Sequence, residues 1–157
     1  MILFLFIILS FSCEETFKDE RETLSQETID ASVGIFAGEV LSKTTATGND
    51  ALWEISIKNQ TGALVVFYWE KSTNLLNKIE GREGPFDYEM NPQTGALSLS
   101  TAKFLAFESL TQKVLSRWTL SRHTNNDLNW VYEFHFQGSE TSILLDAISG
   151  EILAMGF

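Results

Sequence analysis

Apolar and polar residues alternate along two stretches of the chain in the way that half-buried β-strands require. In residues 130–137 (WVYEFHFQ) one face carries only aromatic side chains, namely Trp130, Tyr132, Phe134 and Phe136. The opposite face carries Val131, Glu133, His135 and Gln137. Residues 52–58 repeat the alternation, with Trp53, Ile55 and Ile57 opposite Glu54, Ser56 and Lys58. A period of two places alternate side chains on opposite faces, so both stretches are predicted to be strands.

Turn signals mark where further strands begin and end. Residues 63–69 and 142–145 are short, continuous apolar runs, and each is followed by a polar segment that opens with Glu70 or Asp146. Asn74 and Gly150 then stand where a turn needs a residue with positive φ. We therefore expect further strands at 63–69, 142–145, 75–79 and 151–155.

Two helices precede these strands. Ser25 is a suitable N-cap, and the apolar residues after it have helical spacing: Ile29, Val33, Phe36 and Val40. Ser98 takes the same place ahead of a second stripe, which consists of Ala102, Leu105, Ala106 and Leu110. Helices are expected at both places.

The order of these patterns indicates a duplication. Residues 40–43 return as 114–117, residues 52–57 as 131–136, and Glu70 as Asp146. The predicted fold class is therefore α+β, with two repeated units that each pack one helix on a three- to four-stranded antiparallel sheet. The first unit is expected at 24–81 and the second at 97–157. Residues 82–96 contain both prolines of the chain and are expected to join them.

The chain begins with an apolar run at residues 1–12 that ends at Cys13, its only cysteine. The run is shorter than the roughly 20 residues that cross a bilayer as a helix, and it has the length of a signal-peptide core. Leu9, Ser10 and Ser12 before Cys13 resemble a bacterial lipobox, which implies lipid attachment at Cys13. The acidic residues that follow resemble those of Bacteroidota lipoproteins. The alternative is an incidental thiol in an ordinary secretory signal, and no Lys or Arg precedes the run.

The charged segment 13–23 is expected to be a tether between the lipid and the folded part. The predicted location is therefore the cell envelope, with the lipid anchor in the outer membrane and the protein facing the periplasm or the surface. Nucleic acid is not expected as a partner, because the net charge is −10 and phosphate backbones need Lys and Arg. With Cys13 acylated, no thiol remains for a disulfide or a thiolate metal site.

The second unit resembles a PepSY domain. The resemblance lies in the Ser98-capped helix with Ala102 and Ala106, in the strand 130–134 and in the closing segment 145–153 (LDAISGEIL). The first unit resembles a divergent copy, with Glu70 and Asn74 in place of the Asp and Gly. The resemblance implies a non-catalytic module that binds peptidases near the cell envelope and can inhibit them.

Candidate chemistry is sparse. The chain has two histidines, His123 and His135, and neither begins an H-E-x-x-H motif. Glu133 and His135 could seat a metal but have no evident third ligand, so a solvated pair is the preferred interpretation. The aromatic row of 130–136 is interpreted as the surface on which the helix packs, and a ligand platform is the alternative. No cofactor and no enzymatic activity are expected.

The predicted function is therefore that of an envelope lipoprotein that binds a protein or peptide, with regulation or inhibition of a peptidase as its most specific form. The predicted partner-binding residues lie on the polar sheet face and are Glu54, Glu133, His135 and Gln137; an exposed sheet edge is the other candidate surface. The alternative function is a structural or assembly lipoprotein of an outer-membrane or surface complex.

Overall fold

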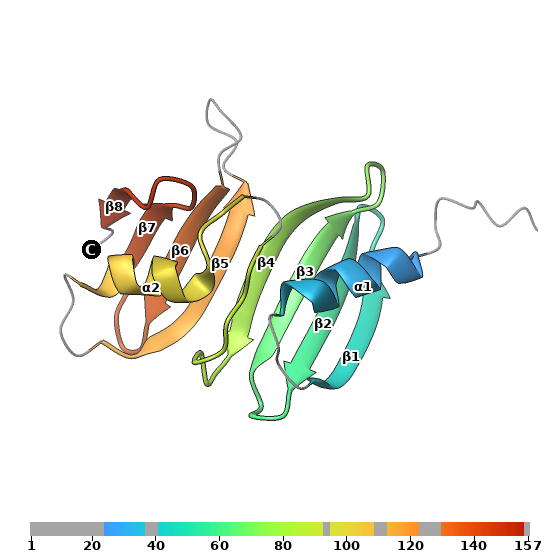
Figure 1. Cartoon of the computed structure of the whole chain (residues 1–157), viewed down its shortest axis with the longest axis horizontal. Helices are drawn as coiled ribbons and strands as arrows, with labels where there is room; N and C mark the ends of the chain where they lie inside the picture. Colours follow the sequence, from blue (N-terminus) through green and yellow to red (C-terminus); the bar gives the residue numbers. More distant parts are fainter. Residues whose placement is uncertain (1–23, 37–40, 93–94, 109–112, 123–129, 156–157) are drawn as a thin grey trace, which may run out of the picture.

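The computed structural model describes residues 24–36, 41–92, 95–108, 113–122 and 130–155. In the described residues the chain forms two helices and eight strands. In chain order these are α1 (Gln26–Ile35), β1 (Leu41–Gly48), β2 (Leu52–Asn59), β3 (Leu64–Glu70), β4 (Leu75–Glu83), α2 (Leu99–Phe107), β5 (Leu115–Arg122), β6 (Trp130–Phe136), β7 (Ser142–Asp146) and β8 (Ile152–Met155). Both helices lie on the same side of the sheet (Figure 1).

All eight strands belong to one antiparallel sheet, in which each strand pairs with its neighbours in sequence, from β1 at one edge to β8 at the other. The predicted fold class, two repeated units that each carry their own small sheet, is therefore wrong. Along the described chain a helix is followed by four strands and this order then recurs, but the strands join edge to edge into a single sheet. The predicted domain boundaries stay predictions, and β4 extends past the first of them to Glu83.

The pairing of β4 with β5 makes the sheet continuous. Lys78 lies opposite Ser121, Ile79 opposite Leu120, and Gly81 opposite Trp118. This register aligns apolar residues of all the central strands on one face, in a row that runs Ile55, Phe67, Ile79, Leu120, Tyr132 and Leu145. Each of these six side chains is fully buried. A single hydrophobic core therefore runs under both helices.

The predicted joining segment contributes to this core, which explains why separate units do not form. Tyr88 and Met90 are buried, and the Tyr88 ring stacks on Phe36 with ring centroids 5.2 Å apart. The Tyr88 hydroxyl accepts a hydrogen bond of 3.0 Å from the indole of Trp118 in β5. Leu99 at the start of α2 donates a backbone hydrogen bond to Met90. The segment thus contacts elements from both halves of the chain.

Both predicted N-caps are confirmed. The Ser25 hydroxyl accepts a hydrogen bond from the backbone N–H of Thr28, and the Ser98 hydroxyl accepts one from Thr101. The first helix, however, ends at Ile35 and does not follow the predicted apolar stripe to Val40, which lies outside the described residues. Leu110 of the second stripe also lies outside them.

The face of α1 that packs on the sheet is partly polar. Thr28, Ser32 and Ile35 are its buried residues. The Trp69 indole donates a hydrogen bond of 2.9 Å to the Ser32 hydroxyl, and Thr28 donates one of 3.0 Å to the Asn74 side chain. Ile29 and Val33 of the predicted stripe are only partly buried against the core. Hydrogen bonds therefore help to dock α1, which a stripe of apolar positions does not reveal.

The two predicted turns are confirmed. Asn74 has a φ of 53° and Gly150 a φ of 79°. One Asp146 carboxylate oxygen accepts hydrogen bonds from the backbone N–H groups of Ile148 and Ser149, at 2.9 and 2.7 Å. These two hydrogen bonds hold the pKa of Asp146 below its usual value, although its slight burial acts in the opposite direction.

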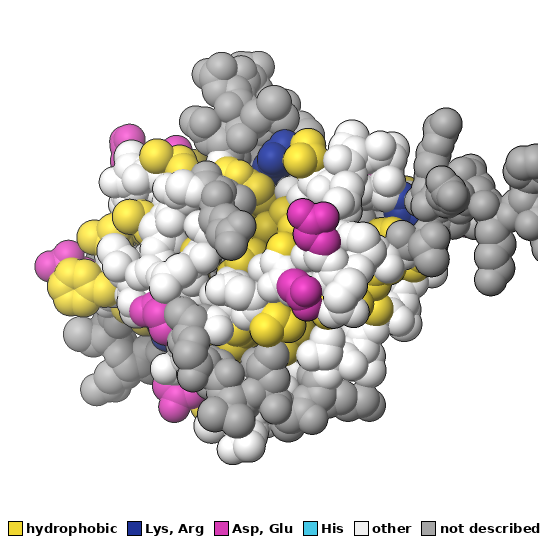
Figure 2. Space-filling model, turned by 45° about the vertical axis from the view of Figure 1, so that its right-hand side comes forward, with side chains coloured by type: hydrophobic (Ala, Val, Ile, Leu, Met, Phe, Trp, Pro, Cys, Tyr) yellow, Lys and Arg dark blue, Asp and Glu magenta, His cyan; other side chains and the backbone are white. Residues whose placement is uncertain are grey.

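Figure 2 shows a side view in which hydrophobic side chains reach the surface in several places and Asp and Glu side chains are scattered between them. Among the described residues, Phe104 of α2 and Val114 before β5 are the most exposed large hydrophobic residues, at 67% and 60%. No helix in the described part of the chain is long and apolar enough to span a membrane.

Candidate functional site: a polar network on the helix-free sheet face

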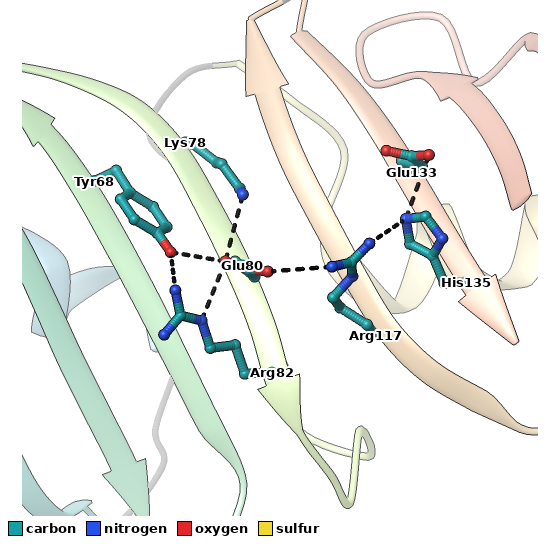
Figure 3. A network of polar contacts seen from close by, with 7 residues as sticks. All are labelled: Tyr68, Lys78, Glu80, Arg82, Arg117, Glu133 and His135. Carbon is teal, nitrogen blue, oxygen red and sulfur yellow. Dashed lines mark hydrogen bonds and ion pairs between the residues drawn. The ribbon is translucent and has the colours of Figure 1, made fainter. Parts of the chain in front are cut away.

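The face of the sheet opposite the helices, here called the outer face, carries a connected group of polar side chains. Figure 3 shows seven of them, from four neighbouring strands: Tyr68, Lys78, Glu80, Arg82, Arg117, Glu133 and His135. They share this face because alternate residues of a strand point the same way and the register places Glu80 opposite Thr119, which in turn lies opposite Glu133. We call this group the outer-face network.

Glu80 is the centre of the network. One of its carboxylate oxygens accepts a hydrogen bond of 2.8 Å from the Tyr68 hydroxyl and one of 3.2 Å from Nε of Arg82. The Lys78 ammonium lies 3.4 Å from the same oxygen. The other oxygen lies 3.9 Å from a guanidinium nitrogen of Arg117, on the neighbouring strand. Arg82 also donates a hydrogen bond to the Tyr68 hydroxyl.

These contacts cover Glu80 although no helix of the described chain lies on this face. The Glu80 side chain is only 8% exposed, whereas those of Arg82 and Arg117 are about half exposed, at 44% and 48%. Burial alone would raise the pKa of Glu80, but the hydrogen bond from Tyr68 and the charges of Lys78 and Arg82 outweigh it and lower that pKa. Glu80 is therefore ionised at neutral pH.

His135 extends the network to β6. Its Nε2 atom lies 3.1 Å from a guanidinium nitrogen of Arg117 and 3.3 Å from a carboxylate oxygen of Glu133. A ring nitrogen without a proton accepts a hydrogen bond from the guanidinium, whereas a ring nitrogen that carries a proton donates a hydrogen bond to the carboxylate. Nε2 therefore makes one of these two hydrogen bonds at a time.

Tyr68 and Glu80 keep one protonation state each at neutral pH. Burial and the neighbouring carboxylate of Glu80 raise the pKa of Tyr68 to about 12, so the phenol keeps its proton. The lowered pKa of Glu80 makes this carboxylate a weak base. In the described part of the chain, no group of three or more His, Cys, Asp and Glu side chains could hold a metal ion. Fixed cations around a buried carboxylate are instead suited to the recognition of charged groups.

The structure brings together only some of the predicted partner-binding residues. Glu133 and His135 belong to the outer-face network. Glu54 lies on the same face in β2, directly opposite Tyr68, and its charge contributes to the raised pKa of that phenol. Gln137 follows the end of β6 and lies apart from the network, at a pocket beside α2. Cys13, the predicted lipid attachment site, lies outside the described residues, as does His123.

Sequence reasoning missed the centre of the network. Lys78, Glu80 and Arg82 occupy alternate positions of β4, but the strand prediction ended at Ile79. Alternation of charged residues in KIEGR, residues 78–82, was the available signal. Arg117 lies in the repeated block 114–117, for which no strand is predicted. Tyr68 lies within an apolar run, 63–69, whose continuous hydrophobicity does not indicate that one of its faces is polar.

The aromatic row of β6 lies in the core, as the packing interpretation predicted. Tyr132 and Phe134 are fully buried, and Trp130 and Phe136 are nearly so. Phe107 of α2 packs against Phe134 and Phe136, with ring centroids 5.6 and 5.4 Å apart. The alternative, an open ligand platform, is therefore wrong.

A pocket of about 940 Å³ lies beside α2. Its apolar lining includes Phe86, Phe104 and Phe107, and its polar lining includes Lys103 and Gln137. Burial lowers the pKa of Lys103 despite the opposing charge of Glu89, and its ammonium donates a hydrogen bond to the backbone carbonyl of Phe86. The Lys103 ammonium therefore already has a hydrogen-bond acceptor within the protein.

Comparisons with known proteins give little guidance. No protein-family model matches the sequence, and the search of curated proteins finds no significant match. Among solved structures, the chain is similar to the crystal structure of a candidate lipoprotein from Clostridium difficile 630, with 8% sequence identity and a TM-score of 0.37. The similarity covers 87% of this chain and 97% of the other. At this TM-score the likeness carries no argument about fold or function.

Proposed function

We propose that this protein is a lipid-anchored protein of the cell envelope that has no catalytic activity of its own and binds a protein or peptide partner through the outer face of its sheet. The observation that carries the binding proposal is Glu80, an ionised and nearly buried carboxylate that three cationic side chains surround on a helix-free face. Burial of charge is costly, and it is tolerated here because the contacts around Glu80 compensate for it. Such a network provides a fixed pattern of charge for a partner to recognise.

The lipid anchor follows from the sequence around Cys13. Each CH₂ group of an acyl chain that enters the bilayer contributes about 0.8 kcal/mol, so two or three chains anchor a protein durably. Replacement of Cys13 by Ser is expected to release the protein from the membrane fraction. Metabolic labelling with a radioactive fatty acid checks the same point, because label is expected in the parent protein and not in C13S. Label in both proteins, or in neither, would contradict the anchor.

The resemblance of the second half to PepSY domains supports a peptidase as the first partner to test. Regulation of a peptidase by this protein would need no catalytic group here, which agrees with the fixed protonation of Tyr68 and Glu80. The assay is the activity of a co-purified envelope peptidase with and without this protein. The proposal predicts that the activity falls as the protein is added, whereas unchanged activity would remove the peptidase from the proposed partners.

Photo-crosslinking in cells tests whether the outer face is the binding surface. A photoreactive amino acid replaces Glu54 or Glu133 on the outer face, or Phe104 on the helix side as a matched control. The proposal predicts a discrete crosslinked product from both outer-face positions and none from position 104. Products from position 104 alone would contradict it. A product that contains outer-membrane assembly machinery, in place of a peptidase, would favour the structural role.

A further inference from the structure

We propose that the outer-face network recognises an acidic side chain of the partner, which binds to the exposed guanidinium groups of Arg82 and Arg117 on either side of Glu80, where β4 meets β5. This inference rests on the proposed function, because it names the chemistry of the partner that the outer face would bind.

The two arginines lie on neighbouring strands of the outer face. Arg82 follows Gly81 in β4 and Arg117 precedes Trp118 in β5, and Gly81 and Trp118 are the last residues that pair between these strands (Figure 3). Like charges on neighbouring strands repel. Both guanidinium groups lie near Glu80, at 3.2 Å for Arg82 and 3.9 Å for Arg117, and Glu80 relieves part of this repulsion.

Glu80 does not neutralise the cations around it. Its single negative charge faces the positive charges of Lys78, Arg82 and Arg117, so these four side chains together carry an excess of two positive charges. The nearest further carboxylate in the network, that of Glu133, lies against His135. The protein as a whole carries a net charge of −10. Charges farther away than about 8 Å are screened at physiological ionic strength, so the local excess determines what binds here.

The two arginines are available to a ligand. Their side chains are 44% and 48% exposed, and each guanidinium has five N–H donors. The hydrogen bonds to Glu80, Tyr68 and His135 fix the guanidinium positions without using all of these donors. A carboxylate is the matching group, because it accepts paired hydrogen bonds from guanidinium groups.

The surroundings favour a single acidic side chain with basic neighbours over an anionic membrane surface. Glu54 in β2 and Glu133 in β6 flank the central cations on the same face. A bilayer of anionic lipids would bring negative charge against both of them. Glu54 and Glu133 lie on opposite sides of the strand pair β4–β5, so an extended segment that crosses the strands meets a carboxylate on each side of the central site. The fitting partner segment therefore has an acidic residue with basic residues a few positions away on each side.

The probe for this inference is the peptide acetyl-Lys-Gly-Gly-Glu-Gly-Lys-amide, and the control peptide has Gln in place of Glu. Full-length, ¹⁵N-labelled protein in detergent micelles is titrated with each peptide and its backbone amide resonances are followed. The expected result is a set of shifts confined to β3, β4, β5 and β6 that the control peptide does not produce. Equal shifts with both peptides, or shifts elsewhere, would overturn the inference.

Two protein variants sharpen the test. R117Q removes one guanidinium and leaves the contacts among Tyr68, Glu80 and Arg82 in place, so it is expected to fold and to bind the peptide about ten-fold more weakly. K113Q is the matched control, because Lys113 lies over the Phe136 ring and away from the network, and its affinity should equal that of the parent. An unchanged affinity in R117Q would overturn the inference.

Vesicles that contain phosphatidylglycerol test the rival ligand. They are added to protein with the Cys13→Ser change, so that the lipid anchor does not hold the protein on them. Binding to the vesicles that R117Q abolishes would assign the site to a phosphate and overturn the acidic-peptide proposal. Failure of the peptide to bind, together with crosslinks from positions 54 and 133, would refute this inference and leave the proposed function standing. Crosslinks from position 104 alone would refute the proposed binding surface, and this inference with it, even if the peptide bound.

Discussion

Replacement of Gly81 by Ala tests how β4 and β5 pack against each other. Gly81 faces the core opposite Trp118, whose indole lies directly over it. A Cβ atom at position 81 would meet the indole nitrogen first and would lie 2.6 and 2.7 Å from two further indole atoms, Cε2 and Cδ1. Trp118 is only 1% exposed, so its ring has little space into which to move.

The expected cost of this change has two parts. Overpacking of a well-packed core costs about 1–3 kcal/mol. Displacement of the indole would also break its hydrogen bond to the Tyr88 hydroxyl, which contributes about 0.5–1.5 kcal/mol. We therefore expect G81A to lower the free energy of unfolding by about 1.5–4.5 kcal/mol in urea denaturation, the range that these two parts define.

Two further variants make this prediction specific. G34A is the matched control, because nothing lies within 4 Å of a Cβ at that position in α1 and Ala favours helix by up to about 1 kcal/mol. W118L is itself destabilising, but it removes the obstructing ring, so G81A should cost about 1–2 kcal/mol less in that background. A cost below about 0.5 kcal/mol for G81A in the parent protein would refute the described contact.

Further predictions concern hydrogen bonds and pH. Y68F leaves the buried Glu80 without one of its hydrogen-bond donors and should lower the free energy of unfolding by about 1–3 kcal/mol in urea denaturation. NMR titration should also show a higher pKa for Glu80 in this variant. An unchanged stability and an unchanged pKa would contradict the hydrogen bond between Tyr68 and Glu80. Both N74G and N74A lose the hydrogen bond from Thr28 of α1, but Gly adopts the positive φ at position 74 more readily than Ala does. N74A should therefore be less stable than N74G by about 1 kcal/mol, and equal stability of the two variants would contradict this. The pKa of Glu89 is lowered although burial opposes this, because the Ser100 side chain and the backbone N–H groups of Ser100 and Met90 donate hydrogen bonds to it. The folded pKa of Glu89 thus lies below its unfolded value, so its contribution to stability is present above pH about 4.5 and is lost as the pH falls through the folded pKa. E89Q should therefore lose less stability than the parent protein between pH 5 and 3. Identical profiles of unfolding free energy against pH for the two proteins would refute this.

Local features of the fold could be predicted from the sequence because their causes are local. The N-caps Ser25 and Ser98 and the turn residues Asn74 and Gly150 act on backbone groups within a few residues of themselves. The strand at 130–136 was predictable because its alternation is complete and its aromatic face is buried.

The joining of the strands into one sheet could not be predicted in the same way. It depends on the pairing of β4 with β5, which lie far apart in sequence, and on core residues of the predicted linker such as Tyr88. The first strand of each half, β1 and β5, was also missed. β1 is rich in Thr and its last five residues, 44–48, are exposed, so it shows no alternation between apolar and polar positions.

The candidate site depends on the same long-range pairing. Glu133 and His135 were found because they alternate with aromatic residues in one strand. Arg117 meets Glu80 only because β5 pairs with β4 in the observed register. A search within single segments could therefore identify one side of the network and not its centre.

The continuity of the sheet is the claim on which the proposed site depends, and unfolding observed at separate positions tests it most directly. The chain has four tryptophans, of which Trp53 and Trp69 lie in the first half and Trp118 and Trp130 in the second. In protein labelled with 5-fluorotryptophan, ¹⁹F NMR follows each of them through a urea titration. Because one core connects both halves, we expect all four native resonances to disappear at the same urea concentration. Loss of the Trp53 and Trp69 signals at a urea concentration different from that for Trp118 and Trp130 would contradict the single sheet.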